Sequence, residues 1–364
     1  MKRGCLALSA LLVSCGLSMP AHAEGQKIDS RASASYSSSD AEGGMSLDQI
    51  RAMPTDVAPF PVQLKVDGGK YLKVRPKIMV PSYGVAYIVS AEARASGAGS
   101  GSSMVNRAIR YNTALVGIDE AAMRLWANEA HADLVTRLTE AGFDVVAPDA
   151  LRADPDYAKV KLTEGNRTQD AQIIDGRAKK GWIVFGADAA PLIKGMSLET
   201  GLGALAAGGS LGAIQNAGVD QDATTFHPML VLDYIGIESS GQKLYSGRAS
   251  ISAETNFGIH PRSKVDFAYK IKRMGGTGYP GWFTIPDGYS SGEPFGVLRE
   301  VDDKSDNLAL HGAMALLGLS NSYTQRKVLA VEAVPERYGA LVRAAYQGYN
   351  QAIVDGIVAA RSGG

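Results

Sequence analysis

The stretch that most constrains the fold is residues 229–255, which has the pattern of two strands joined by a polar turn. Residues 229–237 are apolar at nearly every position except Asp233, which is typical of a strand covered on both faces. Residues 238–243 supply the polar turn, and residues 244–253 alternate between apolar and polar side chains, as a half-buried strand does. We therefore expect an antiparallel hairpin inside a sheet, with helices packed over it.

Two amphipathic helices are predicted to supply that cover. In residues 115–141 apolar side chains recur every four positions, and Gly142 suits the position after a helix end. Residues 335–360 carry a second continuous apolar stripe. Strands at residues 85–90 and 143–146 flank the first helix, which gives a strand, helix, strand order. The predicted fold class is α/β: a layered sheet with a central antiparallel hairpin covered by two long helices, with glycine-rich insertions.

Shorter elements are predicted from local patterns. Residues 62–74 alternate loosely around an Asp-Gly-Gly turn, which indicates a hairpin. Residues 169–180 suggest a short helix, and residues 182–186 have the composition of a strand. A further helix is predicted at residues 306–319.

Composition bounds the class of protein. The chain has 364 residues, of which 45% are hydrophobic and 20% charged, as in a globular protein that buries a substantial core. Its 37 basic and 37 acidic residues leave no net charge. We therefore expect no binding of nucleic acid.

The N-terminus has the features of an export signal. Two basic residues precede an apolar run at residues 6–13, which is too short to span a bilayer permanently. In one interpretation, the Ala-His-Ala sequence at residues 21–23 directs cleavage after Ala23. In the other, Leu-Val-Ser-Cys at residues 12–15 resembles a bacterial lipobox, and Cys15 is lipidated. Both interpretations export the protein.

The same segment contains both cysteines, so the exported chain has no thiol for disulfides, catalysis or metal binding. Residues 24–61 are rich in small and polar residues, and we predict a disordered linker there. The α/β domain is expected at residues 62–361. Its two insertions are expected at residues 195–227 and 257–286.

A catalytic signal is present only as a short motif. Residues 208–212 match Gly-x-Ser-x-Gly, the nucleophile elbow of serine hydrolases, which would make Ser210 the nucleophile. That turn requires a strand directly before it, and residues 201–207 lack the β-branched residues of a strand. No His-Glu-x-x-His motif occurs, and the histidines lie far apart in sequence. We predict a non-enzymatic protein with no cofactor or metal, and a serine hydrolase using Ser210 remains the alternative.

A second hairpin is predicted at residues 264–285. Residues 264–272 alternate without a fault, and a glycine-rich turn leads to an aromatic segment. In one interpretation this is an edge hairpin of a soluble sheet that docks on a partner. In the other it faces lipid, because a transmembrane strand needs roughly nine to eleven alternating residues with aromatics near the interfaces. The side chains concerned are Val265, Phe267, Tyr269, Ile271, Tyr279, Trp282 and Phe283.

The order of these elements resembles the periplasmic domain of the curli secretion channel family. Residues 288–294, Gly-Tyr-Ser-Ser-Gly-Glu-Pro, also resemble a Gly-Tyr-Thr-Ser-x-Glu-Pro stretch that precedes a helix in that channel. The fold is similar to the N-terminal domain of TolB and to lipoproteins that activate cell-wall synthases. The resemblance covers residues 85–360. It implies an exported, often lipidated, ring-forming protein whose two insertions supply β-hairpins to a shared barrel in the outer membrane.

These observations lead to one expected function with two alternatives. We expect an exported, non-enzymatic protein at the periplasm or the periplasmic face of the outer membrane, acting in assembly or secretion of surface protein. Its expected partners are proteins of the cell envelope and further copies of itself. The alternatives are a soluble periplasmic accessory protein and the serine hydrolase.

Overall fold

The computed structural model describes residues 28–29, 45–97, 107–175, 178–195, 209–240, 250–272, 278–301 and 326–362. Within these residues the fold is mixed α/β, and 15 strands join one large mixed sheet. The predicted signal segment, Cys15 and the predicted helix at residues 306–319 lie outside the described residues. No helix within them is both long and apolar enough to cross a bilayer.

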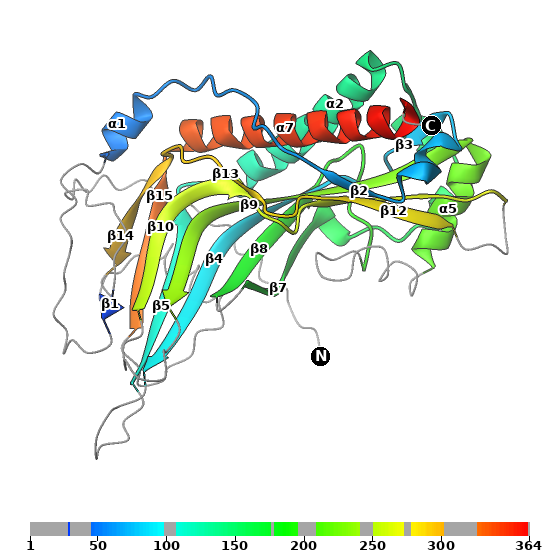
Figure 1. Ribbon diagram of the computed structural model, residues 1–364. Helices are drawn as coiled ribbons and strands as arrows, with labels where there is room; N and C mark the ends of the chain where they lie inside the picture. The colour runs from blue at the N-terminus through cyan, green and yellow to red at the C-terminus, as the bar shows by residue number, and fades with distance from the viewer. Residues whose placement is uncertain are drawn as a thin grey trace, which may run out of the picture.

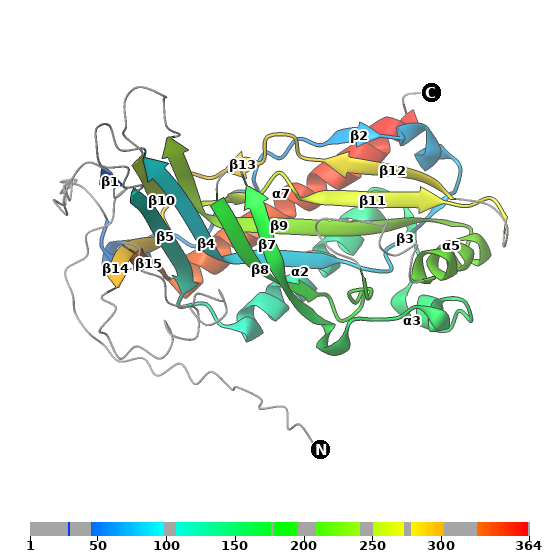
Figure 2. The same cartoon turned by 90° about the horizontal axis from the view of Figure 1, so that it is seen from below.

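The sheet has one main path with further strands joined to its sides (Figures 1 and 2). In order, the path is β14 (Gly296–Val301), β15 (Arg326–Ala333), β5 (Arg107–Val116), β4 (Gly84–Gly97), β9 (Ala223–Ser240), β11 (Lys264–Tyr269), β12 (Tyr279–Thr284) and β2 (Lys65–Asp67). The side strands are β1 (Ile28–Asp29), β3 (Lys77–Met79), β6 (Asp144–Val145), β7 (Arg167–Asp175), β8 (Ala178–Gly186), β10 (Ser250–Ile259) and β13 (Tyr289–Ser290). Because β9 pairs along its length with β3, β4, β10 and β11, it is the centre of the sheet.

The β9–β10 hairpin confirms the antiparallel pair predicted at residues 229–255. Three successive β9 residues, Leu230, Val231 and Leu232, are fully buried, and since neighbours along a strand point to opposite faces, both faces are covered. The predicted turn is wrong in position. Ser239 pairs with Ile251, so residues 238–240 continue the strand, and the connection at residues 241–249 lies outside the described residues.

Two long helices, α2 (Glu120–Glu140) and α7 (Pro335–Ser362), lie side by side above the sheet in Figure 1. The predicted start of the first helix at residue 115 is too early, because β5 runs to Val116. The Asp119 side chain accepts a hydrogen bond from the Ala122 N–H and caps the helix. The two helices meet in the core, where the rings of Trp126 and Tyr338 lie 5.8 Å apart.

A smaller core lies under the opposite face at one end of the sheet, where α5 (Ser210–Asp220) and α3 (Pro148–Arg152) pack (Figure 2). Short 3-10 helices complete the described elements: η1 (Gly69–Lys73), η2 (Tyr157–Lys159) and η3 (Glu164–Asn166). The buried side chains of the smaller core are Met79, Leu151, Tyr157, Ile193, Ile214, Ala217 and Ala223.

The linker predicted at residues 24–61 is ordered in its described C-terminal part. Helix α1 (Leu47–Arg51) begins with a capping box, in which the Ser46 hydroxyl accepts from the Gln49 N–H and the Gln49 side chain accepts from the Ser46 N–H. Ile50 and Phe60 are buried. Residues 45–61 are therefore packed against the domain, because these two apolar side chains have a core to enter.

Two local predictions are wrong because of tertiary pairing. Residues 62–74 do not form a hairpin: β2 ends at Asp67, Gly68 follows with a φ of 73°, and η1 begins directly after it. Residues 169–180 are not a helix. They belong to the antiparallel pair β7–β8, and β8 pairs in turn with β4, so the sheet overrides the local helical pattern.

The predicted insertions are parts of the domain. Residues 257–286 contain the end of β10 and all of β11 and β12, and β11 lies directly beside β9. Of residues 195–227, the described part contains α5 and the start of β9. Both segments belong to the body of the domain, because β11 pairs with β9 and α5 packs against the start of β9.

Candidate functional site

A groove with a volume of about 760 Å³ separates the margin of the sheet from the C-terminal half of α7. We call it the β2–α7 groove. The wall on the sheet side consists of Val62, Gln63, Leu64, Val66, Gly69, Lys70 and Lys73. The wall on the helix side consists of Ala352, Asp355, Gly356, Ala359 and Ala360.

The sheet-side wall is built around the edge strand β2, which contributes Val66, while residues 62–64 precede this strand and Gly69, Lys70 and Lys73 belong to η1. Strand β2 pairs on one side with β12, where Val66 lies opposite Phe283, and no strand of the described residues lies beyond it (Figure 2). The outer edge of such a strand presents unpaired N–H and C=O groups. Val62, Leu64 and Val66 pack partly against the main core, while the residues between them are exposed. The groove therefore joins a free backbone edge to apolar side chains at alternate positions.

The chain reaches this edge by crossing α7 as a strap, residues 54–64. The Phe60 N–H donates to the carbonyl of Ala344 over 3.0 Å. At Gly348 an added Cβ would lie 2.8 Å from the Phe60 nitrogen and closer still to its carbonyl oxygen. Only glycine allows this approach, so Gly348 fixes the course of the strap and with it the position of β2.

The helix-side wall is shallow because its side chains are small. At Gly356 an added Cβ would lie 2.6 Å from Cε1 of Phe283, so this glycine lets the helix approach the core. An added Cβ on Gly69 would lie 3.5 Å from that of Ala360, which shows how closely η1 approaches the helix. Ala359 lines the groove and is exposed, so the groove is open to solvent at this residue.

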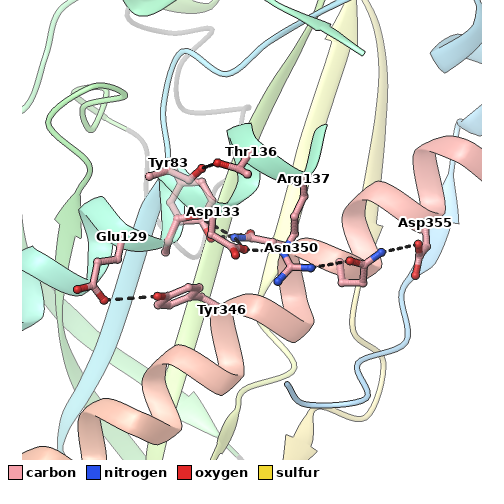
Figure 3. A network of polar contacts seen from close by, with 11 residues as sticks. Tyr83, Glu129, Asp133, Thr136, Arg137, Tyr346, Asn350 and Asp355 are labelled. Atoms are coloured by element: carbon pink, nitrogen blue, oxygen red, sulfur yellow. Dashed lines mark hydrogen bonds and ion pairs between the residues drawn. The ribbon is translucent and has the colours of Figure 1, made fainter. Parts of the chain in front are cut away.

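A chain of polar contacts holds α7 in place and ends in the groove (Figure 3). The Tyr83 hydroxyl donates to Asn350 over 2.9 Å, and the Asn350 amide donates to Asp133 over 2.9 Å. From Asp133 the contacts continue through Arg137 to Gln351, whose amide donates to Asp355 over 2.8 Å. The end of this chain at Tyr83 and Asn350 is buried, and buried polar contacts fix one arrangement of the elements that they join. Here they fix α7 against α2 and against the residue that precedes β4.

The stretch at residues 288–294 anchors the start of α7. The buried Arg337 guanidinium donates to the Glu293 carboxylate over 2.6 Å and to the Pro294 carbonyl over 3.3 Å. It also donates to the carbonyl of Pro54, at the beginning of the strap. The motif that carries the family resemblance thus has a structural role in this chain.

The hairpin at residues 264–285 forms as predicted, but between β9 and β2 rather than at the edge of the sheet. Its side chains Val265, Phe267 and Phe283 are fully buried, and Tyr269 is nearly so. The burial of Val265, Phe267 and Phe283 in the main core argues against a lipid-facing hairpin, which would need these side chains to point outward. The side chains that remain exposed are Ile271, Tyr279 and Trp282.

Ser210 is the first residue of α5 and is buried. Its hydroxyl oxygen accepts a hydrogen bond from the Lys161 N–H over 3.2 Å, and the preceding Gly209 has a φ of 74°. Residues 201–208, where the strand of a nucleophile elbow would lie, are outside the described residues. Within the described residues no group of three or more His, Cys, Asp or Glu is arranged to hold a metal ion.

The β2–α7 groove is absent from the sites predicted from sequence. Its two walls come from residues 62–73 and 352–360, which no local pattern connects. A signal in the sequence that points to this site is the pair of glycines Gly348 and Gly356 inside a long amphipathic helix. Glycine in a helix interior costs stability, so its presence there indicates that another part of the chain packs closely against the helix. In comparisons with known proteins, no family model, no curated protein and no solved structure matches this chain.

Proposed function

We propose that this is an exported, non-enzymatic protein of the cell envelope that binds a partner polypeptide in the β2–α7 groove. The observation that carries the proposal is the free edge of β2, which opens directly into a groove with apolar side chains. An extended peptide added to such an edge gains main-chain hydrogen bonds, and its alternate side chains enter neighbouring pockets. The groove volume of about 760 Å³ is sufficient for several side chains.

The partner's side chains would meet two different walls. Those that point into the groove would contact Val62, Leu64 and Val66 on one side and the small residues of α7 on the other. We also propose that α2 and α7 together cover the sheet. With α7 held in that cover, the helix-side wall of the groove stays at the same distance from β2 whether or not a partner is bound.

Export to the periplasm or to the periplasmic face of the outer membrane is part of the proposal and is supported by the N-terminal sequence. The narrower proposal, drawn from the resemblance, is a ring of copies that assembles or secretes surface protein. The molar mass of detergent-extracted protein, measured by light scattering, separates the two. A large defined oligomer favours the ring, and a monomer favours a soluble accessory protein.

Blocking the groove is expected to abolish partner binding without unfolding the protein. In Ala359→Trp an indole fills the open part of the groove from an exposed position of α7. A dodecapeptide selected from a displayed random library for binding to the wild-type protein should bind this variant at least about tenfold more weakly, equivalent to roughly 1.4 kcal/mol. Fluorescence anisotropy of the labelled peptide measures the affinity.

The matched control is Val358→Trp, which introduces the same side chain at an exposed neighbouring position that does not line the groove. It should leave the affinity unchanged. Equal weakening in both variants, or in neither, would contradict the proposed site.

A further inference from the structure

We propose that a second surface of this protein, separate from the groove's helix wall, binds the anionic surface of a lipid bilayer. It consists of three exposed apolar side chains, Val74, Ile271 and Tyr279, which are 47%, 54% and 41% exposed. We call it the tyrosine end, because Tyr71 and Tyr269 pack beneath it. Exposed apolar side chains gathered in one place indicate an interaction surface, whereas single ones are ordinary.

The tyrosine end is held together by ring contacts and hydrogen bonds. The rings of Tyr269 and Tyr279 stack at 5.1 Å with an interplanar angle of 19°, and Tyr71 lies 5.3 Å from Tyr279. Arg75 binds the segment after η1 to the end of β11, because its guanidinium donates to the carbonyls of Lys270 and Ile271 over 2.9 and 3.3 Å. Residues far apart in sequence are thereby held on one surface.

The charges around the tyrosine end are mostly positive. Lys70, Lys73 and Lys272 are exposed and have no ion-pair partner in the part of the chain that the structure describes. The Lys70 ammonium lies 5.0 Å from the centre of the Tyr71 ring. Among the carboxylates nearby, Asp222 is paired with Arg75, while Asp67 precedes η1 and Asp355 lines the groove with Lys70 and Lys73. Three lysines without an ion-pair partner in the described residues therefore accompany the apolar side chains.

This combination fits an anionic bilayer better than a protein partner. Tyrosine rings are enriched at the headgroup level of membranes, where the ring is partly buried and the hydroxyl stays hydrated. Lysine side chains are long enough to keep their charge among anionic headgroups while apolar neighbours insert, and each contributes attraction to such a surface. Apolar insertion with electrostatic attraction is the usual mode of peripheral membrane binding.

Cosedimentation of the intact exported protein with vesicles tests the proposal. Vesicles of phosphatidylcholine with one third phosphatidylglycerol should bind it at least about tenfold more strongly than phosphatidylcholine alone, since each lysine near an anionic surface contributes about fivefold. Ile271→Ser should lower this partition severalfold, and Ile271→Ser with Tyr279→Ser should lower it further. Lys272→Glu should lower it about fivefold or more.

Leu125→Ser is the matched control, because Leu125 is 53% exposed on α2, away from the tyrosine end. It should partition like the wild-type protein. Circular dichroism melting checks that each variant folds, and Ile271→Ser alone keeps the test valid if the double variant does not. Absence of vesicle binding, equal binding to neutral vesicles, or no loss in Ile271→Ser would overturn the proposal. Binding to an acidic protein but not to vesicles would also overturn it.

Discussion

Gly348→Ala is expected to destabilise the protein by about 2 to 3 kcal/mol, although alanine normally stabilises a helix interior relative to glycine. The new Cβ would lie 2.8 Å from the Phe60 nitrogen and against its carbonyl. Because these are backbone atoms, a change of side-chain rotamer cannot relieve the overlap. The strap must move away from α7 and lose the hydrogen bond between the Phe60 N–H and the Ala344 carbonyl. Urea unfolding followed by circular dichroism measures the loss.

Gly212→Ala is the matched control, since Gly212 lies inside α5 with nothing near the position of its added Cβ. There the change should be neutral or stabilise by up to about 1 kcal/mol. Hydrogen exchange adds a local reading: in Gly348→Ala the amides of β2 should exchange faster than in the wild-type protein. Equal stability of Gly348→Ala and the wild-type protein would show that the strap does not depend on this contact.

Acidification from pH 7.5 to pH 5 is expected to destabilise the protein by about 4 kcal/mol through two buried histidines. Burial lowers the pKa of His227 to about 3 and the pKa of His131 to about 4. The unfolded chain binds these protons near pH 6.5, and the folded protein does not, so stability falls as the pH falls below that value. Each histidine contributes about 2 kcal/mol at pH 5.

The surroundings of His227 make it the sharper test. Neither of its ring nitrogens has a hydrogen-bond partner in the described residues, and Asp266 lies directly opposite it on β11. Burial raises the pKa of Asp266, and the nearby Lys264 partly offsets this rise. Asp266 therefore opposes the loss of stability only at pH values where its own carboxyl takes up a proton. Guanidinium unfolding across pH 5 to 7.5 measures the slope.

His227→Leu should remove about half of that pH dependence, or about 2 kcal/mol at pH 5. At pH 7.5 the variant should be at least as stable as the wild-type protein, because no hydrogen bond of the ring is lost. His131→Leu should remove most of the remaining pH dependence of the stability. A slope that His227→Leu leaves unchanged would show that this histidine is not buried in the neutral form.

The elements that sequence predicted best are those whose own residues decide their structure. Residues 264–272 alternate strictly, and β11 forms at residues 264–269 and pairs with β12 as predicted, although the polar side chains Asp266 and Lys270 are buried as well. The apolar stripe from Pro335 likewise becomes α7. By contrast, the pair β7–β8 forms because β4 offers a neighbouring strand, which a local pattern in residues 169–180 does not reveal. Helix α5 was missed because its glycine- and alanine-rich sequence has weak periodicity.

The side chains chosen from sequence for a functional surface divide according to burial. Alternation correctly placed Val265, Phe267 and Phe283 on one face, but could not tell whether core or lipid covers that face. The answer depends on α7, because Gly356 lets this helix approach Phe283. These two residues lie 73 positions apart along the chain. The same limit explains why neither wall of the β2–α7 groove was foreseen.

Peptide binding in the β2–α7 groove is tested most directly by selecting dodecapeptides on the wild-type protein and removing those that also bind Ala359→Trp. The quantity measured is the spacing of apolar residues in the remaining peptides. Strand addition at β2 predicts apolar residues at every second position, since alternate side chains of an extended peptide enter the groove. Apolar residues spaced three and four apart would indicate a bound helix instead. That result, or no enrichment over the variant, would contradict strand addition at β2.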